Sequence, residues 1–101
     1  MASPTETTPT PPSASPDQAL LEALRSRAPG AFEQLVRTHG GRLLAVARRL
    51  LGNEEDARDA VQETFMNAYR SIDRFEGGSL LSTWLHRIAV NVSLMKLRTR
   101  K

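Results

Sequence analysis

The 101-residue sequence contains no cysteine, and its apolar residues form no long run. The first absence excludes a disulfide framework and a thiolate metal site. The second argues against a membrane-spanning helix, which needs roughly 20 consecutive apolar residues. No alternating strand pattern and no internal repeat is present, which argues against a β-rich or solenoid fold. These absences favour a small cytoplasmic protein with no membrane partner.

The residues that enzymes use are also missing in the required combinations. There is no cysteine nucleophile and no phosphate-binding Gly-Lys loop. No carboxylate pair lies at helical metal spacing beside a histidine, and no metal spacing joins His39 and His86. We therefore expect no enzymatic activity, no metal and no cofactor.

Residues 1–16 hold five of the six prolines, with serine and threonine in most of the gaps. Such a segment has too little apolar surface to offset the entropy cost of ordering, so we expect a disordered tail. It also lacks the basic start and the apolar run of a signal peptide. Residues 17–101 remain to form one small domain.

Apolar residues at three- and four-residue intervals predict helices through the rest of the chain. The first covers residues 17–25, with Asp17 at its N-terminal end, where an anion is favourable. The second covers residues 32–51, and Gly52 is a helix stop. Gly40-Gly41 weakens its middle, and two outcomes stay open there: a kink, or close packing of a neighbour.

Asn53 is followed by three acids, which predicts a capped start for a third helix that runs to about Ile72. A glycine-rich loop over residues 73–81 follows, and we expect Ser79 or Ser82 to cap a final helix. The predicted fold class is all-α, a small bundle of about four helices with short connections.

Charge is distributed unevenly along this pattern. Residues 54–63 contain five acids and one base, whereas the last eighteen residues contain five bases and no acid. The basic end suits a polyanion and the acidic segment would be repelled by one, so the chain could contact two partners with two faces.

The final helix combines an apolar stripe with an open polar face. The stripe consists of Leu81, Trp84, Leu85, Ile88, Ala89 and Val92, and the open face of Arg87, Asn91, Leu94 and Arg98. A basic helix with Asn and Arg on its open face, after a glycine-rich loop, has the components of a nucleic-acid reader. Taken alone, the helix fits an ordinary solvated C-terminal helix better.

Several segments at matching spacing resemble region 2 of extracytoplasmic-function sigma factors, members of the sigma-70 superfamily of bacteria. The resemblance covers roughly residues 17–100. Its segments are Asp59-Ala60-Val61-Gln62-Glu63-Thr64-Phe65, Ala68-Tyr69-Arg70, Phe75-Glu76-Gly77 and Thr83-Trp84-Leu85-His86-Arg87-Ile88-Ala89-Val90-Asn91.

The resemblance implies a promoter-recognition subunit of RNA polymerase that acts in transcription initiation. It implies that the third helix docks on the clamp helices of the largest polymerase subunit. The matching positions are Asp59, Gln62, Glu63, Met66 and Asn67. An acidic and amide surface with one exposed methionine suits a basic coiled coil. The alternative is that Asp59 and Glu63 only keep a helix soluble.

The resemblance also implies that the loop before the final helix captures a base flipped from the non-template strand of the minus-ten element. The residues that match this surface are Phe75, Gly77, Gly78, Ser79 and Ser82. Loop glycines allow the backbone to approach a nucleotide closely. Many relatives have a basic residue at Glu76, an acid at Gly78 and an aromatic at Leu81, so the identity of the captured base stays open.

In the final helix, Arg87, Asn91 and Arg98 match the surface that meets the minus-ten strand. Asn offers a donor and an acceptor to a base edge, and Arg offers a fork to a phosphate. Trp84 could wedge against DNA, but its register favours the core or partial burial. We expect His86 at the surface near DNA.

Members of this family carry a second helical domain that reads the minus-thirty-five element, and this sequence lacks it. An excised fragment and a shortened relative both stay open as explanations. An alternative function also stays open: a helical module that binds a regulator, such as an anti-sigma factor, and never meets DNA.

Overall fold

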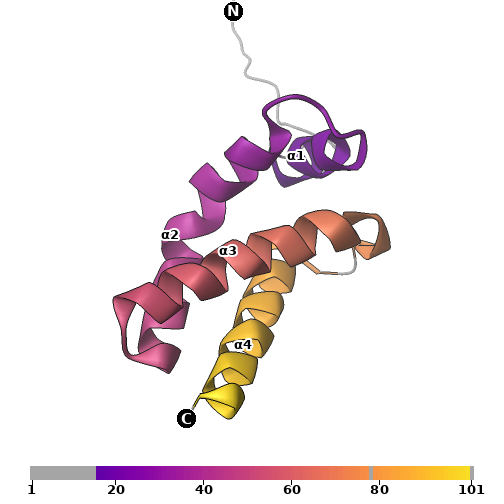
Figure 1. Ribbon diagram of the computed structural model, residues 1–101. Coiled ribbons are helices and arrows are strands. Elements are labelled where there is room, and N and C mark those ends of the chain that lie inside the picture. Colours follow the sequence, from indigo (N-terminus) through magenta and orange to yellow (C-terminus); the bar gives the residue numbers. More distant parts are fainter. Residues whose placement is uncertain (1–15, 78, 101) are drawn as a thin grey trace, which may run out of the picture.

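The computed structural model describes residues 16–77 and 79–100, which form an all-helical fold without strands in these ranges (Figure 1). The elements are α1 (Pro16–Arg25), α2 (Ala31–Leu51), α3 (Glu54–Ser71), a 3₁₀ turn η2 (Ile72–Arg74) and α4 (Leu81–Thr99). This confirms the predicted all-α class. The predicted disordered tail lies outside the described residues, apart from Pro16, which begins α1.

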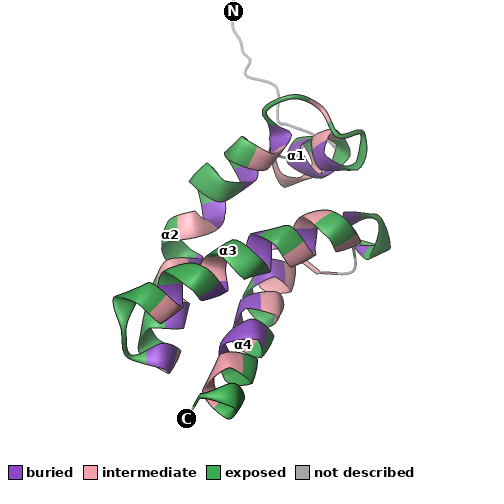
Figure 2. Ribbon diagram, in the orientation of Figure 1, coloured by how far each residue is buried: buried purple, intermediate pink, exposed green. Residues whose placement is uncertain are grey.

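Helices α2, α3 and α4 each pack against the other two, and α1 packs against α2 and η2. Figure 2 shows buried residues on the facing sides of the helices. The larger core cluster joins all four helices through side chains such as Leu24, Leu35, Phe65 and Leu85. A smaller cluster around Ala47, Leu51, Ala57, Ala60 and Val92 closes the end of the bundle where α2 turns into α3.

The short helix α1 is held by its side chains. Leu20, Leu21 and Leu24 are buried. Arg25 donates a hydrogen bond to the backbone carbonyl of Phe75, at the start of the loop before α4. A helix of ten residues is marginal in water on its own, so α1 owes its order to this packing.

Arg27 fastens the turn after α1 to the end of α3. Its guanidinium donates to the carbonyl of Tyr69 at 3.0 Å. The same group lies over the Tyr69 ring, 4.5 Å from the centroid, and 3.7 Å from Asp73. Several weak attractions therefore converge on one side chain.

Helix α2 runs unbroken through Gly40-Gly41. A Cβ atom built on Gly40 would meet Val36 and Phe65 only at ordinary distances of 3.8 and 3.9 Å, and one on Gly41 would meet nothing within 4 Å. Close packing of a neighbour therefore does not require either glycine. Gly52 ends the helix as predicted: it has the left-handed φ of 78° and donates to the carbonyl of Arg48 at 2.9 Å.

Helix α3 begins with the predicted cap, because the Asn53 side chain accepts the Asp56 N–H at 2.8 Å. Glu54 accepts two hydrogen bonds from Arg48, at 2.7 and 2.9 Å, and one from Arg58 at 3.0 Å. The hydrogen bonds from Arg48, assisted by those from Arg58, lower the pKa of Glu54 to about 2. The acidic first turn is thus tied to the end of α2.

The predicted cap of α4 is wrong. Leu80 occupies the N-cap position and provides no side-chain hydrogen bond. Ser79 lies one residue too early, and its hydroxyl donates to the Leu80 carbonyl at 3.4 Å. Ser82 lies inside the first turn of the helix. The N–H groups at the start of α4 therefore have no side-chain cap.

Candidate functional site

One candidate surface is a hollow on the outer side of α3, called the acidic hollow below after its two carboxylates, Asp59 and Glu63, although two cations balance their charge. Four of the five residues predicted to contact polymerase line it, together with two cations. The lining residues are Asp59, Gln62, Glu63, Met66, Arg70 and, from α4, Lys96, around a volume of about 440 Å³. Met66 is 48% exposed, so an apolar side chain lies open among polar groups.

Asn67, the fifth predicted residue, does not line this hollow. It is half-buried, and its side-chain oxygen accepts a hydrogen bond from the Arg70 guanidinium. This hydrogen bond orients the Arg70 side chain, which lines the hollow.

Lys96 is a member of this surface that the sequence did not indicate. Its Nζ lies 4.0 Å from Oε1 of Glu63, although the sequence groups Lys96 with the basic end of the chain. Only the crossing of α3 and α4 brings the two side chains together, and no local pattern encodes that crossing.

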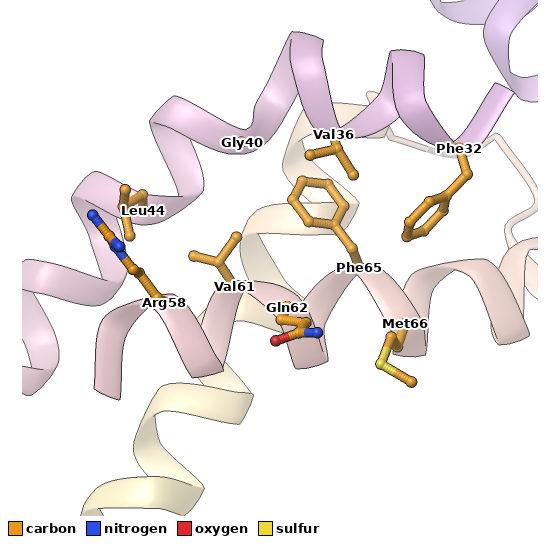
Figure 3. Close-up of a pocket in the computed structure, with 9 residues that line it drawn as sticks. All are labelled: Phe32, Val36, Gly40, Leu44, Arg58, Val61, Gln62, Phe65 and Met66. Atoms are coloured by element: carbon orange, nitrogen blue, oxygen red, sulfur yellow. The ribbon is translucent and has the colours of Figure 1, made fainter. Parts of the chain in front are cut away.

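An apolar groove between α2 and α3 adjoins the acidic hollow (Figure 3). Figure 3 shows Phe32 and Val36 on α2 directed toward Phe65 on α3. Gln62 and Met66 line both the groove and the acidic hollow, so the two form one continuous surface. The groove has a volume of about 420 Å³, and the sequence analysis did not predict it.

A second hollow of about 180 Å³ lies between α1 and the loop before α4. Three of the predicted DNA-binding residues line it: Phe75, Gly77 and Ser79. Gly77 has the left-handed φ of 82°, which glycine adopts readily. Gly78, predicted beside them, lies outside the described residues.

Helix α1 supplies the opposite wall of this loop hollow. Asp17, Gln18 and Leu21 line it, and the sequence analysis did not assign any of them to a site. They are more than 50 residues away along the chain, so only the packing of α1 reveals them. Their carboxylate and amide add to the hydrogen-bonding groups of the hollow, which also include the Ser79 hydroxyl.

Phe75 and Trp84 form a pair beneath the loop. Their ring centroids are 5.0 Å apart, with an interplanar angle of 43°. Phe75 is only 6% exposed, so it shapes the wall of the loop hollow more than it offers a surface to a ligand. Trp84 is half-buried, which confirms the preference for the core or partial burial.

The open face of α4 is as predicted. Arg87, Asn91, Leu94 and Arg98 are all exposed, as is His86. Within residues 16–77 and 79–100, the side chains of Arg87, Asn91 and Arg98 have no hydrogen-bond or ion-pair partner. Their donors and acceptors are therefore available to a ligand, whereas Ser82 lies half-buried at the start of the helix.

Arg100, directly after α4, is partly neutralised by a carboxylate of α3. Arg100 lies 2.6 Å from the Asp56 carboxylate. Asn53 and then Arg100 donate hydrogen bonds that lower the pKa of this carboxyl group. Among the described residues of α4, the unpaired positive charges thus lie on Arg87 and Arg98.

Two kinds of feature are absent from the described part of the chain. No group of three or more His, Cys, Asp or Glu residues there could hold a metal ion. No described helix is long and apolar enough to cross a membrane.

Comparison with known proteins identifies the family and the fold. Residues 35–101 match the family Sigma-70 region 2. A solved structure is similar over 83% of this chain and 87% of its own chain, with a TM-score of 0.76 and 36% sequence identity. It is an NMR structure of an engineered region 2 of sigmaE in complex with GTAAAA.

Three relatives are similar over most of this chain. The ECF RNA polymerase sigma factor SigE of Mycolicibacterium smegmatis is 41% identical over 69% of this chain and 27% of its own length. The RNA polymerase sigma-H factor of Pseudomonas aeruginosa is 36% identical over 83% of this chain and 44% of its own length. The ECF RNA polymerase sigma factor SigW of Bacillus subtilis is 38% identical over 70% of this chain and 38% of its own length.

The chain therefore belongs to the sigma-70 region 2 family, as a region 2 domain of the extracytoplasmic-function type. It spans less than half the length of these three relatives.

Proposed function

We propose that this domain acts in the cytoplasm as the part of a sigma factor that directs RNA polymerase to promoters by binding, without catalysis. In this proposal α3 docks on the clamp helices of polymerase. The loop before α4 and the open face of α4 capture unpaired non-template bases of the minus-ten element. The similarity to the sigmaE region 2 complex with GTAAAA is the observation that carries the DNA part.

The chemistry of the α4 face supports contact with DNA. The unpartnered amide of Asn91 suits a base edge, and the unpartnered guanidinium groups of Arg87 and Arg98 suit phosphates. Ser82 and Trp84 lie in the first turn of the same helix, next to the loop hollow. The hollow contributes Gly77 and Ser79, with Phe75 as its apolar wall.

Energy limits what the domain does by itself. Each stacked base-pair step costs about 1.4 kcal/mol to undo, so opening some ten steps needs on the order of 14 kcal/mol. A few base contacts from one small domain do not supply this amount. The domain is therefore proposed to capture bases that are already unpaired, while polymerase provides the remaining binding energy.

The polymerase part rests on the acidic hollow and the adjoining apolar groove. Asp59 and Glu63 attract a basic coiled coil, and Gln62 offers it hydrogen bonds. Met66 and the groove behind it accept an apolar side chain of the same partner. One continuous surface thus offers charge at one part and an apolar anchor site at another.

The DNA part is tested with single-stranded minus-ten oligonucleotides of both strands, across salt concentrations and single-base substitutions. We expect a preference for one strand that is lost when one base is changed. Asn91→Ala should weaken this preference, whereas Gln34→Ala, an exposed amide on α2, should not. Equal binding to every oligonucleotide, with only a salt dependence, would contradict the proposed base capture.

The polymerase part is tested by pull-down of a purified clamp fragment. Glu63→Gln should reduce capture, while Glu33→Gln, an exposed acid on α2 that does not line the acidic hollow, should leave it unchanged. Equal capture by wild type and Glu63→Gln would place the docking surface elsewhere.

A further inference from the structure

A small polar hollow lies between α2 and the first two turns of α4. Arg42 contributes from α2, and Ser82, Thr83 and His86 contribute from α4, around a volume of about 220 Å³. All four side chains carry hydrogen-bond donors, and none carries a negative charge. The sequence analysis placed Ser82 at the DNA-binding surface and His86 near DNA, and it did not connect α2 with DNA.

The positive charge of this hollow is not neutralised by the described part of the protein. Arg48, Arg58, Arg27 and Arg100 each lie within 4.0 Å of a carboxylate. Arg42, by contrast, is exposed and has no carboxylate or hydrogen-bond partner among residues 16–77 and 79–100. Its fork of donors is therefore open to an anion.

The beginning of α4 adds to this preference for anions. No acid occupies its first turn, and Leu80 offers no cap to the N–H groups there. The partial positive charge of the helix N-terminus adds to the charge of Arg42. The four side chains define the hollow, and the helix N-terminus strengthens its preference for anions.

We propose that Arg42, Ser82, Thr83 and His86 bind one phosphodiester of the promoter strand. This inference rests on the proposed function, because the hollow shares Ser82 with the DNA-binding surface. A phosphodiester supplies the several acceptor oxygens that a guanidinium and two hydroxyl groups can share. The DNA path then extends from the face of α4 across to α2, and Arg42 positions the strand without reading its sequence.

The first test compares Arg42→Gln with Arg37→Gln. Both residues are exposed arginines on α2 without an ion-pair partner in the described ranges, and only Arg42 lines the hollow. One phosphate contact to a single strand contributes about 0.7 to the slope of log affinity against log salt. The affinity advantage of wild type over Arg42→Gln should thus shrink about 2.6-fold between roughly 50 and 200 mM salt.

Arg42→Gln should weaken binding to all oligonucleotides by the same factor and keep the base preference. Arg42→Lys should restore most of the salt slope, because the charge is retained. Arg37→Gln should match wild type. An unchanged slope in Arg42→Gln, or a loss of base preference without a change in slope, would overturn the assignment.

Backbone amide NMR separates the two sources of a phosphate group. The amides of Ser82 and Thr83 should shift on titration with the oligonucleotide and much less with inorganic phosphate at the same concentration. Equal affinity for inorganic phosphate would overturn the assignment to nucleic acid. If wild type shows no base preference at all, the proposed base capture fails, yet the slope comparison still decides the phosphate contact.

Discussion

The position of Lys96 leads to a prediction about polymerase binding, although the sequence groups this residue with the basic end of the chain. Its ammonium group lies 4.0 Å from the Glu63 carboxylate, inside the acidic hollow. A basic partner that docks there must compete with Lys96 for Glu63 and is also repelled by Lys96. Replacing Lys96 by alanine should therefore strengthen binding to the clamp.

The geometry sets the size of this effect. Two unit charges 4.0 Å apart interact by about 1 kcal/mol in water and about 4 kcal/mol at an effective dielectric constant of 20. The Lys96 and Glu63 side chains are 28% and 54% exposed, so the lower value applies. Exposed ion pairs contribute about 0.2–1 kcal/mol. Lys96→Ala should thus raise affinity for the clamp by up to about fivefold.

The assay is a fluorescence-anisotropy titration of a labelled clamp fragment at low and high salt. The gain should fall as salt rises, because these charges are exposed and screened. Arg98→Ala removes an exposed cation two residues further along α4 that has no carboxylate partner in the described residues, and it should leave clamp affinity unchanged. In a Glu63→Gln background, the effect of Lys96→Ala should shrink.

Weaker clamp binding by Lys96→Ala would show that Lys96 does not compete with the partner for Glu63. An equal gain in Arg98→Ala would show that the effect reflects net charge alone and does not depend on the Lys96–Glu63 contact.

Three further predictions concern stability and are measured by thermal or denaturant unfolding. Leu85→Ala should cost about 2–5 kcal/mol because Leu85 is fully buried, while Leu94→Ala, at a side chain 41% exposed, should cost far less. Asn53→Ala removes the N-cap of α3 and should cost about 1 kcal/mol. Burial lowers the pKa of His39 below its ordinary value of 6.5, so the unfolded chain binds more protons. Stability should therefore be full above pH 6.5 and fall as the pH drops toward the lowered pKa, and His39→Gln should flatten this fall.

The sequence predicted those features that local interactions determine. The cap at Asn53 and the stop at Gly52 depend on a few neighbouring residues, and both are confirmed. The apolar stripe of α4 follows from the helical period, and its predicted members are buried or half-buried. The predicted cap of α4 was wrong. Serine is favoured at helix starts but does not by itself determine where a helix begins, and Leu80 occupies the N-cap position instead.

The composition of the surfaces depended on contacts between distant segments. Lys96 beside Glu63, Asp17 beside the loop, and Arg42 beside Ser82 each join residues far apart in the chain. The angles at which side chains of neighbouring helices interdigitate decide these pairs. Periodicity identifies the face of a helix but does not state which face of another helix it meets.

The attachment of α1 has a consequence for dynamics. Because α1 is too short to be stable alone, it should detach as a cooperative unit while the other helices stay packed. Arg25 holds the Phe75 carbonyl, so the same opening releases the beginning of the loop. The amide hydrogens of α1 and of this loop should then exchange with solvent at a common rate. A nucleotide bound in the loop hollow should slow hydrogen exchange in α1 and in the loop. Binding at the loop would then also be detected in α1, near the N-terminal end of the chain.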